Sequence, residues 1–327
     1  VLVLFSTIVS HLFGASVGRE GTAVQMGGAL SEQIGKFLKV NEEERKIILM
    51  SGISGGFGAV FGTPLAGTLF GMEVSETGNI KYEAVIPCFM ASFIGDIVTR
   101  GLLIKHDIYI IEFIPKESIW LFIKVIIASI IFGIAAIVFS ESIHYMKNVF
   151  AGKVKNPVLR PVIGGVIVIV LTLVSGTTMY NGIGTSIISK SFTENLPDLT
   201  FLWKMLFTSI SLGSGFQGGE VTPIFYVGSA LGNTLAGIMN EPVSFFAALG
   251  FIAVFSGCSN APIACFLMGI ELFGSAGALY LFMASIISYI FSGHHGIYNS
   301  QIIATAKSKL LHSDEGKKLG NIKEENK

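Results

Sequence analysis

The sequence contains few charged residues and few cysteines. Asp, Glu, Lys and Arg make up 13% of its 327 residues, against about 25% in an ordinary soluble domain. The 22 basic and 22 acidic residues give a net charge of zero. The chain has no excess of positive charge to bind phosphates, so no nucleic-acid partner is expected. The three cysteines are an odd number without metal-ligand spacing, which predicts neither a disulfide framework nor a metal site.

Hydrophobic residues are abundant instead. They form 51% of the chain, and long runs such as 121–139, 162–174 and 279–291 are nearly free of charge. In a lipid-facing segment only a helix satisfies all of its own backbone hydrogen bonds. The composition therefore predicts an all-α, multi-pass membrane protein with the lipid bilayer as its surroundings.

The apolar segments are numerous and many are short. Several span only 11–16 residues, whereas a helix needs about 20 to cross the hydrocarbon core. Together with the 39 glycines, this predicts broken, tilted helices that meet inside the membrane. The segments lie at 1–16, 22–38, 46–62, 64–74, 82–103, 118–146, 158–175, 183–192, 199–212, 222–239, 244–256, 262–273, 276–292 and 297–311.

Two glutamates lie in matching passages 200 residues apart. Glu20 and Glu220 each stand in an apolar context, where an ionisable side chain is costly and by default marks an ion or proton pathway. The two passages match in register at Leu12 and Leu212, Gly18 and Gly218, Thr22 and Thr222, and Gly28 and Gly228.

A second match, offset by 198, supports a duplication. It aligns Pro64, Ala66, Gly71 and Glu73 with Pro262, Ala264, Gly269 and Glu271. The two glutamates of this match are expected at helix ends or helix interfaces rather than in transport. The two sets of matching residues follow each other in the same order in both halves of the chain, which predicts two inverted-topology repeats.

The expected organisation is a first membrane repeat at 1–150, a second at 151–306 and a polar cytoplasmic tail at 307–327. Lysines in the linker 147–160 and in the tail place both in the cytoplasm. Fewer residues precede Glu20 than precede Glu220 within its half, so roughly 44 residues of the first repeat are expected before Val1.

Glycines around the first glutamate indicate a helix start inside the membrane. Gly18, Arg19 and Gly21 flank Glu20, and an apolar segment follows. The free N–H groups and positive dipole end of such a helix attract an anion. Glu20 is therefore a candidate gate that occupies an anion site and leaves it when protonated. The passage 218–223 is the second such start, with Pro223 suited to the first turn.

Other patterns support competing interpretations. Gly213–Gly218 fits a dinucleotide pattern but has no βαβ context, so no cofactor is expected. Ser54 within Gly52–Gly56 fits a serine-nucleophile pattern, and an intramembrane enzyme using Ser54 and a histidine stays open as an alternative. Close helix packing is the preferred explanation for these glycines. His294 and His295 are interpreted as a surface turn rather than a metal or pH-sensing site.

The motifs resemble those of the CLC family of chloride channels and proton-coupled antiporters. Gly18-Arg-Glu-Gly21 with Val24-Gln25 and Gly27 matches the family signature, and Ser214–Gly219 with Pro223 is similar to its second anion-site segment. Pro64–Gly67 with Glu73, and Tyr298 after a late apolar span, fit the same family. Threonine at position 22 and the Glu220-Val-Thr222 sequence resemble the bacterial fluoride/proton antiporter branch.

The resemblance implies a role for each of these residues. Glu20 would be the external gate and proton carrier, and Glu220 would assist coupling. The anion would be bound by Tyr298 and Thr222 hydroxyls and by the backbone around Gly18, Arg19, Gly21, Gly219 and Val221. Fluoride is small and strongly hydrated, so compact hydroxyl and amide donors suit it.

The resemblance also implies a homodimer in the bacterial cytoplasmic (inner) membrane that exports fluoride in exchange for protons. A chloride/proton antiporter and a passive anion channel remain alternatives. Val74 stands where chloride antiporters often carry a second glutamate, so the internal proton route must differ from theirs. The family's first anion-site loop would precede Val1.

Overall fold

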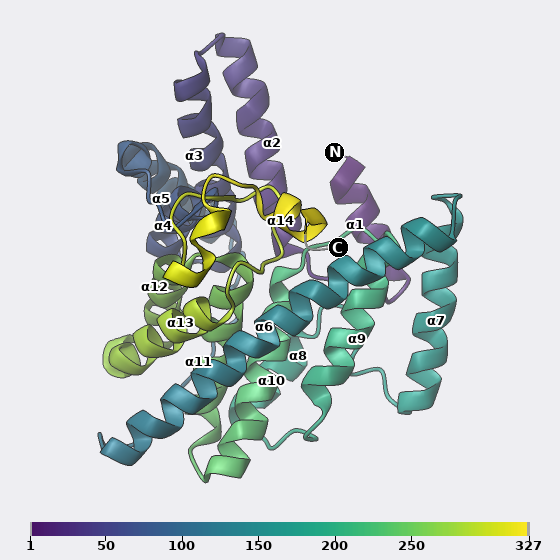
Figure 1. Cartoon of the computed structure of the whole chain (residues 1–327), viewed down its shortest axis with the longest axis vertical. Coiled ribbons are helices and arrows are strands. Elements are labelled where there is room, and N and C mark those ends of the chain that lie inside the picture. Colours follow the sequence, from purple (N-terminus) through teal and green to yellow (C-terminus); the bar gives the residue numbers. More distant parts are fainter. Residues whose placement is uncertain (1, 326–327) are drawn as a thin grey trace.

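Helices occupy nearly all of the expected apolar segments (Figure 1). The structure, a computed structural model, describes residues 2–325, with side chains to residue 322. The helices are α1 (Leu2–Leu12), α2 (Glu20–Leu38), α3 (Glu42–Phe61), α4 (Pro64–Glu73), α5 (Val85–Gly101), α6 (Ile119–Lys153), α7 (Leu159–Ser175), α8 (Thr185–Thr193), α9 (Thr200–Gly213), α10 (Val221–Met239), α11 (Val243–Ser259), α12 (Pro262–Phe273), α13 (Ala278–Phe291) and α14 (Leu319–Glu325).

The expected mixture of short and long helices is confirmed. Only α6, α10 and the segment Tyr82–Gly101 around α5 are both long and apolar enough to cross a membrane by themselves, among the described residues. The apolar helices α1, α7, α11, α12 and the segment Ser275–Phe291 around α13 are shorter. The helices therefore have to meet inside the bilayer, where their ends become available for a site.

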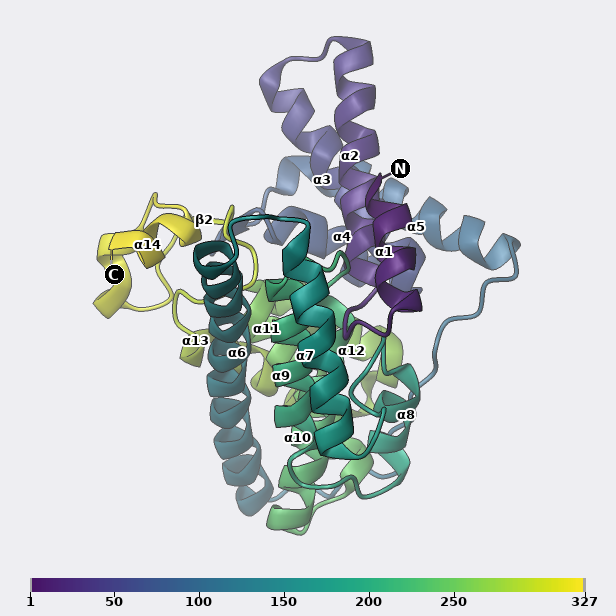
Figure 2. The same ribbon diagram turned by 90° about the vertical axis from the view of Figure 1, so that its right-hand side faces the viewer.

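The helices α2–α5 and α10–α13 repeat one arrangement. In both sets the first helix packs on the second, and the second packs on the third and fourth. The first two helices cross so closely that a Cβ on Gly27 would lie 2.2 Å from the Gly52 oxygen, and one on Gly228 would lie 2.2 Å from the Gly250 oxygen. Figures 1 and 2 show α2 and α10 running in opposite directions, as inverted repeats require.

The repeats also exchange capping carboxylates. The backbone N–H groups of Leu65 and Ala66, at the start of α4, donate to Glu271 at 3.0 and 2.8 Å. At the start of α12, those of Ile263 and Ala264 donate to Glu73 at 3.3 and 2.9 Å. Each carboxylate thus satisfies free donors at the other helix's N-terminus, which confirms both glutamates as interface groups.

Loss of these caps should destabilise the fold. We expect Glu73→Ala to lower the free energy of unfolding by about 1–3 kcal/mol, because two N–H groups would lose their charged acceptor. Glu271→Ala should cost less, since Glu73 is buried and Glu271 is half-buried. Unfolding in detergent micelles measures both, with the exposed Glu83→Ala as control. Equal stability of Glu73→Ala and Glu83→Ala would contradict the capping role.

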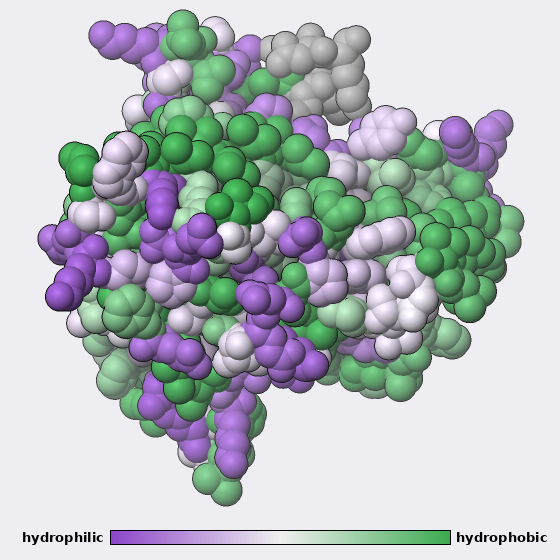
Figure 3. Space-filling model, turned by 90° about the horizontal axis from the view of Figure 1, so that it is seen from below, coloured by the Kyte–Doolittle hydropathy of each residue, from purple (hydrophilic) through white to green (hydrophobic). Residues whose placement is uncertain are grey.

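The outer helices present hydrophobic side chains outward, as contact with lipid requires. The most exposed on α7 include Val162, Val166, Ile169 and Leu173. By contrast, α10 and α11 are almost wholly buried and form the centre of the core. Figure 3 shows this pattern from below: hydrophobic side chains cover the right-hand edge, where α7 lies, and hydrophilic ones gather over the left and centre.

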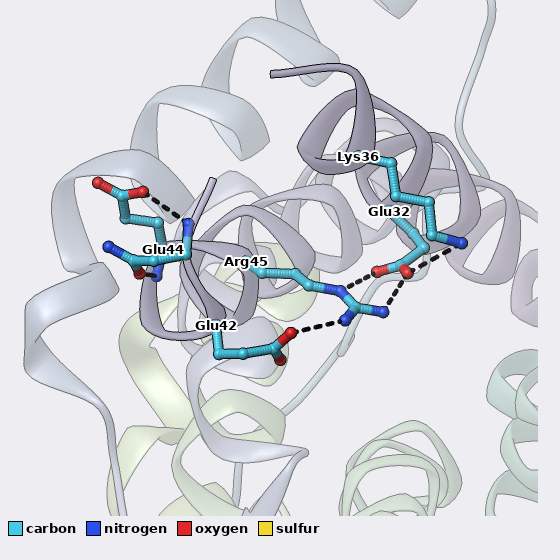
Figure 4. A network of polar contacts seen from close by, with 6 residues as sticks. Glu32, Lys36, Glu42, Glu44 and Arg45 are labelled. Atoms are coloured by element: carbon cyan, nitrogen blue, oxygen red, sulfur yellow. Dashed lines mark hydrogen bonds and ion pairs between the residues drawn. The ribbon is translucent and has the colours of Figure 1, made fainter. Parts of the chain in front are cut away.

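The tip of the α2–α3 hairpin is tied together by charged groups (Figure 4). Arg45 donates through Nε to Glu32 Oε2 at 2.9 Å and through Nη1 to Glu42 Oε1 at 3.1 Å. Lys36 lies 3.4 Å from Glu32, and Asn41 and Glu44 form a capping box at the start of α3. This concentration of charge is typical of a helix end in water rather than in lipid.

The segment 297–311 forms no α-helix, unlike the other apolar segments. Ile302–Ile303 (β2) pairs in parallel with Glu76–Thr77 (β1), and Lys309–Asp314 forms a 3-10 turn. The Gln301 amide donates to the carbonyls of Val74 and Ser259 at 2.8 and 2.7 Å. A polar side chain that bonds to two separate backbone segments holds the chain extended, which the apolar content of the segment did not reveal.

The C-terminal segment is folded against the helices rather than extended away from them. Leu319 and Ile322 are buried with Ile303 in a small cluster. The expected polar tail, 307–327, thus has an ordered, partly apolar portion up to residue 325, and residues 326 and 327 lie outside the described residues. The linker expected at 147–160 begins within α6, which continues to Lys153.

Candidate anion site

The two matching glutamate passages meet at one point. Gly18 and Gly219 form a reciprocal pair of hydrogen bonds, each N–H donating to the other's carbonyl at 2.7 Å. This isolated antiparallel bridge joins the residues just before α2 and α10. Two helix N-termini, with their free N–H groups and positive dipole ends, therefore converge within the membrane domain.

The glycines allow this approach. A Cβ on Gly219 would lie 2.6 Å from the Gly21 nitrogen, and one on Gly21 would lie 2.8 Å from the Gly219 Cα. On Gly18, a Cβ would lie 2.8 Å from the Thr222 hydroxyl. Any larger residue at these positions would push the two helix starts apart, which explains the glycine frame seen in the sequence.

Glu20 folds back over this meeting point. Its side chain is 9% exposed and accepts a hydrogen bond from the Arg19 N–H at 3.0 Å and one from the Thr222 hydroxyl. The Arg19 Nε lies 3.5 Å from the other carboxylate oxygen. Donors from both helix starts thus surround one carboxylate, an arrangement that makes this place a candidate anion site.

A cavity of about 380 Å³ opens next to this carboxylate. Arg19, Glu20 and Thr222 line it from the helix starts, and the connection between α5 and α6 contributes Lys105 and His106. This Glu20 cavity gives the carboxylate access to water, and its lining carries two cationic side chains, Arg19 and Lys105, beside the anionic Asp107. Lys105 and His106 were missed by the sequence analysis, because they lie in a loop with no motif.

Glu220 has a different partner. Its carboxylate, 19% exposed, lies 3.8 Å from the Lys147 ammonium on α6. Tyr298 packs against the main core. Neither Glu220 nor Tyr298 lines the Glu20 cavity. Lys147 carried no sequence signal beyond its place in a basic linker.

The two matched threonines have diverged in their contacts. Thr222, next to Val221 in the first turn of α10, donates to Glu20. Thr22 shares a hydrogen bond of 3.1 Å with Thr7 of α1. Only one of the duplicated hydroxyls therefore contacts Glu20, an asymmetry that the sequence match alone did not reveal.

Ser54 lies where neighbouring helices pack closely against each other. Its hydroxyl donates to the Thr68 carbonyl at 3.3 Å, and a Cβ on Gly71 would lie 2.1 Å from that hydroxyl. A Cβ on Gly56 would lie 2.9 Å from the Ala23 oxygen. These contacts favour close helix packing as the explanation of the 52–56 glycines, as the sequence analysis preferred.

The fold and the site define a class: an all-helical membrane transport protein with two inverted repeats and a carboxylate at paired helix starts. A sequence model of the family described as voltage gated chloride channel matches residues 1–293. The chain belongs to this family, which confirms the CLC resemblance seen in the motifs.

Individual relatives point in the same direction. A chloride/fluoride channel protein of Pseudomonas syringae pv. tomato is 43% identical over 312 residues, covering 94% of this chain and 69% of the relative. A crystal structure of a CLC-type fluoride/proton antiporter superposes with a TM-score of 0.88 at 32% identity, covering 91% of this chain and 76% of the other. The H(+)/Cl(-) exchange transporter ClcA of Vibrio campbellii is 27% identical, covering 92% of this chain and 69% of the relative.

Proposed function

We propose that this protein is a proton-coupled antiporter that exports fluoride from the cytoplasm in exchange for protons. The observation that carries the proposal is the position of Glu20, whose carboxylate accepts hydrogen bonds from Arg19 and Thr222 where two helix starts meet. A carboxylate in a place that suits an anion competes with a transported anion for the same donors.

This competition couples the two ions. When Glu20 takes up a proton it loses its charge, and the Thr222 hydroxyl and the neighbouring N–H groups become free for a fluoride ion. When the anion leaves, the deprotonated side chain returns to the donors. The carboxylate and the anion therefore alternate at one place, and each passage of fluoride requires a change in the protonation of Glu20.

The groups at the start of α10 favour fluoride over chloride. Fluoride holds its water strongly, so a site for it has to offer short, strong hydrogen-bond donors. The Thr222 hydroxyl and the N–H groups of the α2 and α10 starts are such donors. The Pseudomonas relative, a chloride/fluoride channel protein, and the fluoride/proton antiporter structure support this choice.

Changing both polar groups of the second helix start should alter selectivity. We expect the double variant Glu220→Ala with Thr222→Ala to lower the ratio of fluoride to chloride flux about tenfold, because fluoride depends more on the lost donor. Flux of each ion from proteoliposomes measures the ratio. Ser229→Ala, which changes a buried hydroxyl later in α10, serves as control. An unchanged ratio would contradict the assignment of Thr222 and Glu220 to fluoride selectivity.

The direct test of the function uses the purified protein in liposomes. A fluoride gradient is imposed, the voltage is short-circuited, and proton movement is recorded, with chloride as the comparison. Uphill proton movement driven by fluoride alone is the expected result. Anion flux without proton movement would make the protein a channel, and equal coupling to chloride would make it a chloride antiporter. Absence of any flux would favour the alternative of an intramembrane enzyme that uses Ser54.

The organisation of the chain follows from the same proposal. We infer that 1–150 and 151–306 are the two membrane repeats and that the following segment lies in the cytoplasm. The lysines of the linker and the C-terminal segment support that orientation. The bacterial relatives support a place in the bacterial inner membrane, and the exposed apolar side chains of α5, among them Phe93 and Ile97, suit a homodimer interface or lipid.

A further inference from the structure

A second and larger cavity lies between α6 and the C-terminal segment. Its volume is about 1120 Å³. One wall consists of α6 residues including Ser142 and Lys147, and the other of residues from 293–322, including Asp314 and Ile322. Figure 2 shows α14 beside the upper end of α6. We call this space the tail cavity, because the C-terminal segment forms one of its walls.

The tail cavity has a fixed wall. The ammonium of the half-buried Lys307 donates to Asn260 Oδ1 at 2.5 Å, to the Tyr289 carbonyl at 2.8 Å and to Ser292 Oγ at 2.9 Å. His294 is hydrogen-bonded to Asp314 at 2.8 Å. These contacts hold the C-terminal segment against the ends of α11 and α13. The wall of the cavity that this segment forms is therefore fixed in place.

Lys147 connects this cavity with the anion site. It lines the tail cavity, and its ammonium lies 3.8 Å from the Glu220 carboxylate. Glu220 immediately precedes α10, next to the Gly219 that bonds to Gly18. The Lys147 side chain is 46% exposed, so its ammonium remains hydrated and has room to change partner.

We propose that the tail cavity is the inner vestibule of the fluoride path and that Lys147 is the residue that binds fluoride there beside Glu220. The inference rests on the proposed function. The Lys147 ammonium keeps its three protons throughout. When Glu220 takes a proton from a hydronium ion in the cavity and releases its water, the ammonium loses its charged partner and is free to bind an incoming fluoride ion. When Glu220 releases the proton, the carboxylate displaces the anion from Lys147.

Charge at this position can be tested without relying on proton coupling. We expect Lys147→Met to lower the initial fluoride flux about tenfold at low fluoride concentration, with much less effect at saturating fluoride, because a charged binding partner is lost. Lys147→Arg, which keeps the charge, should stay within a few-fold of the parent protein. The matched control is Lys153→Met, an exposed lysine at the end of the same helix that does not line the cavity.

A chemical rescue separates charge from structure. In Lys147→Cys, the new thiol is labelled in detergent with a methanethiosulfonate reagent that carries either a trimethylammonium or a sulfonate group, before reconstitution. The three native cysteines are buried, which favours labelling at position 147. The cationic reagent should restore most of the low-fluoride flux, and the anionic reagent should not.

Three results would overturn the proposal. Unchanged flux in Lys147→Met would show that the ammonium does not meet the anion. A loss that is equal at all fluoride concentrations, or a rescue that is equal with both reagents, would assign Lys147 a structural role only. Failure of the proposed function is seen separately, as absence of fluoride-driven proton movement in the parent protein.

Discussion

Replacing Glu20 with glutamine is expected to abolish proton movement while fluoride still crosses the membrane. Glutamine has nearly the same shape as glutamic acid and can still accept hydrogen bonds from Arg19 and Thr222, but it carries no exchangeable acidic proton. Because it is neutral, it resembles the protonated gate and leaves the donors more readily than a carboxylate. The anion path therefore stays usable while coupling is lost.

Proteoliposomes report both quantities in the same preparation. Fluoride-driven proton movement should fall by at least about 100-fold, the scale on which a missing proton-transfer group acts, whereas fluoride flux should persist. Glu43→Gln changes an exposed glutamate in the first turn of α3 and serves as control for the change of charge. Coupled proton movement that survives in Glu20→Gln would remove Glu20 from the proton path.

Replacing Gly219 with alanine should disrupt transport by forcing the two helix starts apart. The added Cβ would lie 2.6 Å from the Gly21 nitrogen, a backbone atom that cannot move away without shifting α2. The reciprocal Gly18–Gly219 hydrogen bonds would be strained at the same time. Overpacking of this kind costs about 1–3 kcal/mol of stability, and a displacement of about 1 Å in a site can lower activity about 100-fold.

The same helix offers a matched control for this substitution. Gly237 lies in the last turn of α10, is exposed, and has no atom within 4 Å of the position of an added Cβ. Gly237→Ala should leave flux unchanged and raise stability slightly, since alanine is the better helix former. Fluoride flux and detergent unfolding measured on both variants test the idea. Equal flux in the two would show that the close contact of the helix starts is not needed.

Much of the helical pattern was predictable from local residues. Pro64 and Pro262 mark the first turns of α4 and α12, and the apolar segments locate the helices, because a first-turn proline and an apolar run act over a few neighbouring residues. The segment 297–311 was the exception. Gln301 bonds there to Val74 and Ser259, and partners so distant in sequence leave no mark in the local pattern.

The candidate site was predictable only in part. Glu20 and its glycine frame stand out because a charged residue in an apolar, glycine-rich stretch is unusual. The Lys147 ion pair with Glu220 does not stand out, since a lysine near a helix end is common and its partner is far away in sequence. The exchange of capping carboxylates between Glu73 and Glu271 likewise depends on how two separate helices face each other.

The sequence by itself determined that this is an all-helical membrane protein of the voltage-gated chloride channel family, built on a duplicated glutamate motif. Low charge, apolar runs and motif spacing are properties of the chain, and they persist whatever its shape. Only the tertiary structure decided that Thr222 donates to Glu20, and that Lys147 joins Glu220 to the tail cavity. Those contacts arise because two inverted repeats meet with their helix starts opposed, which brings together groups from distant parts of the chain.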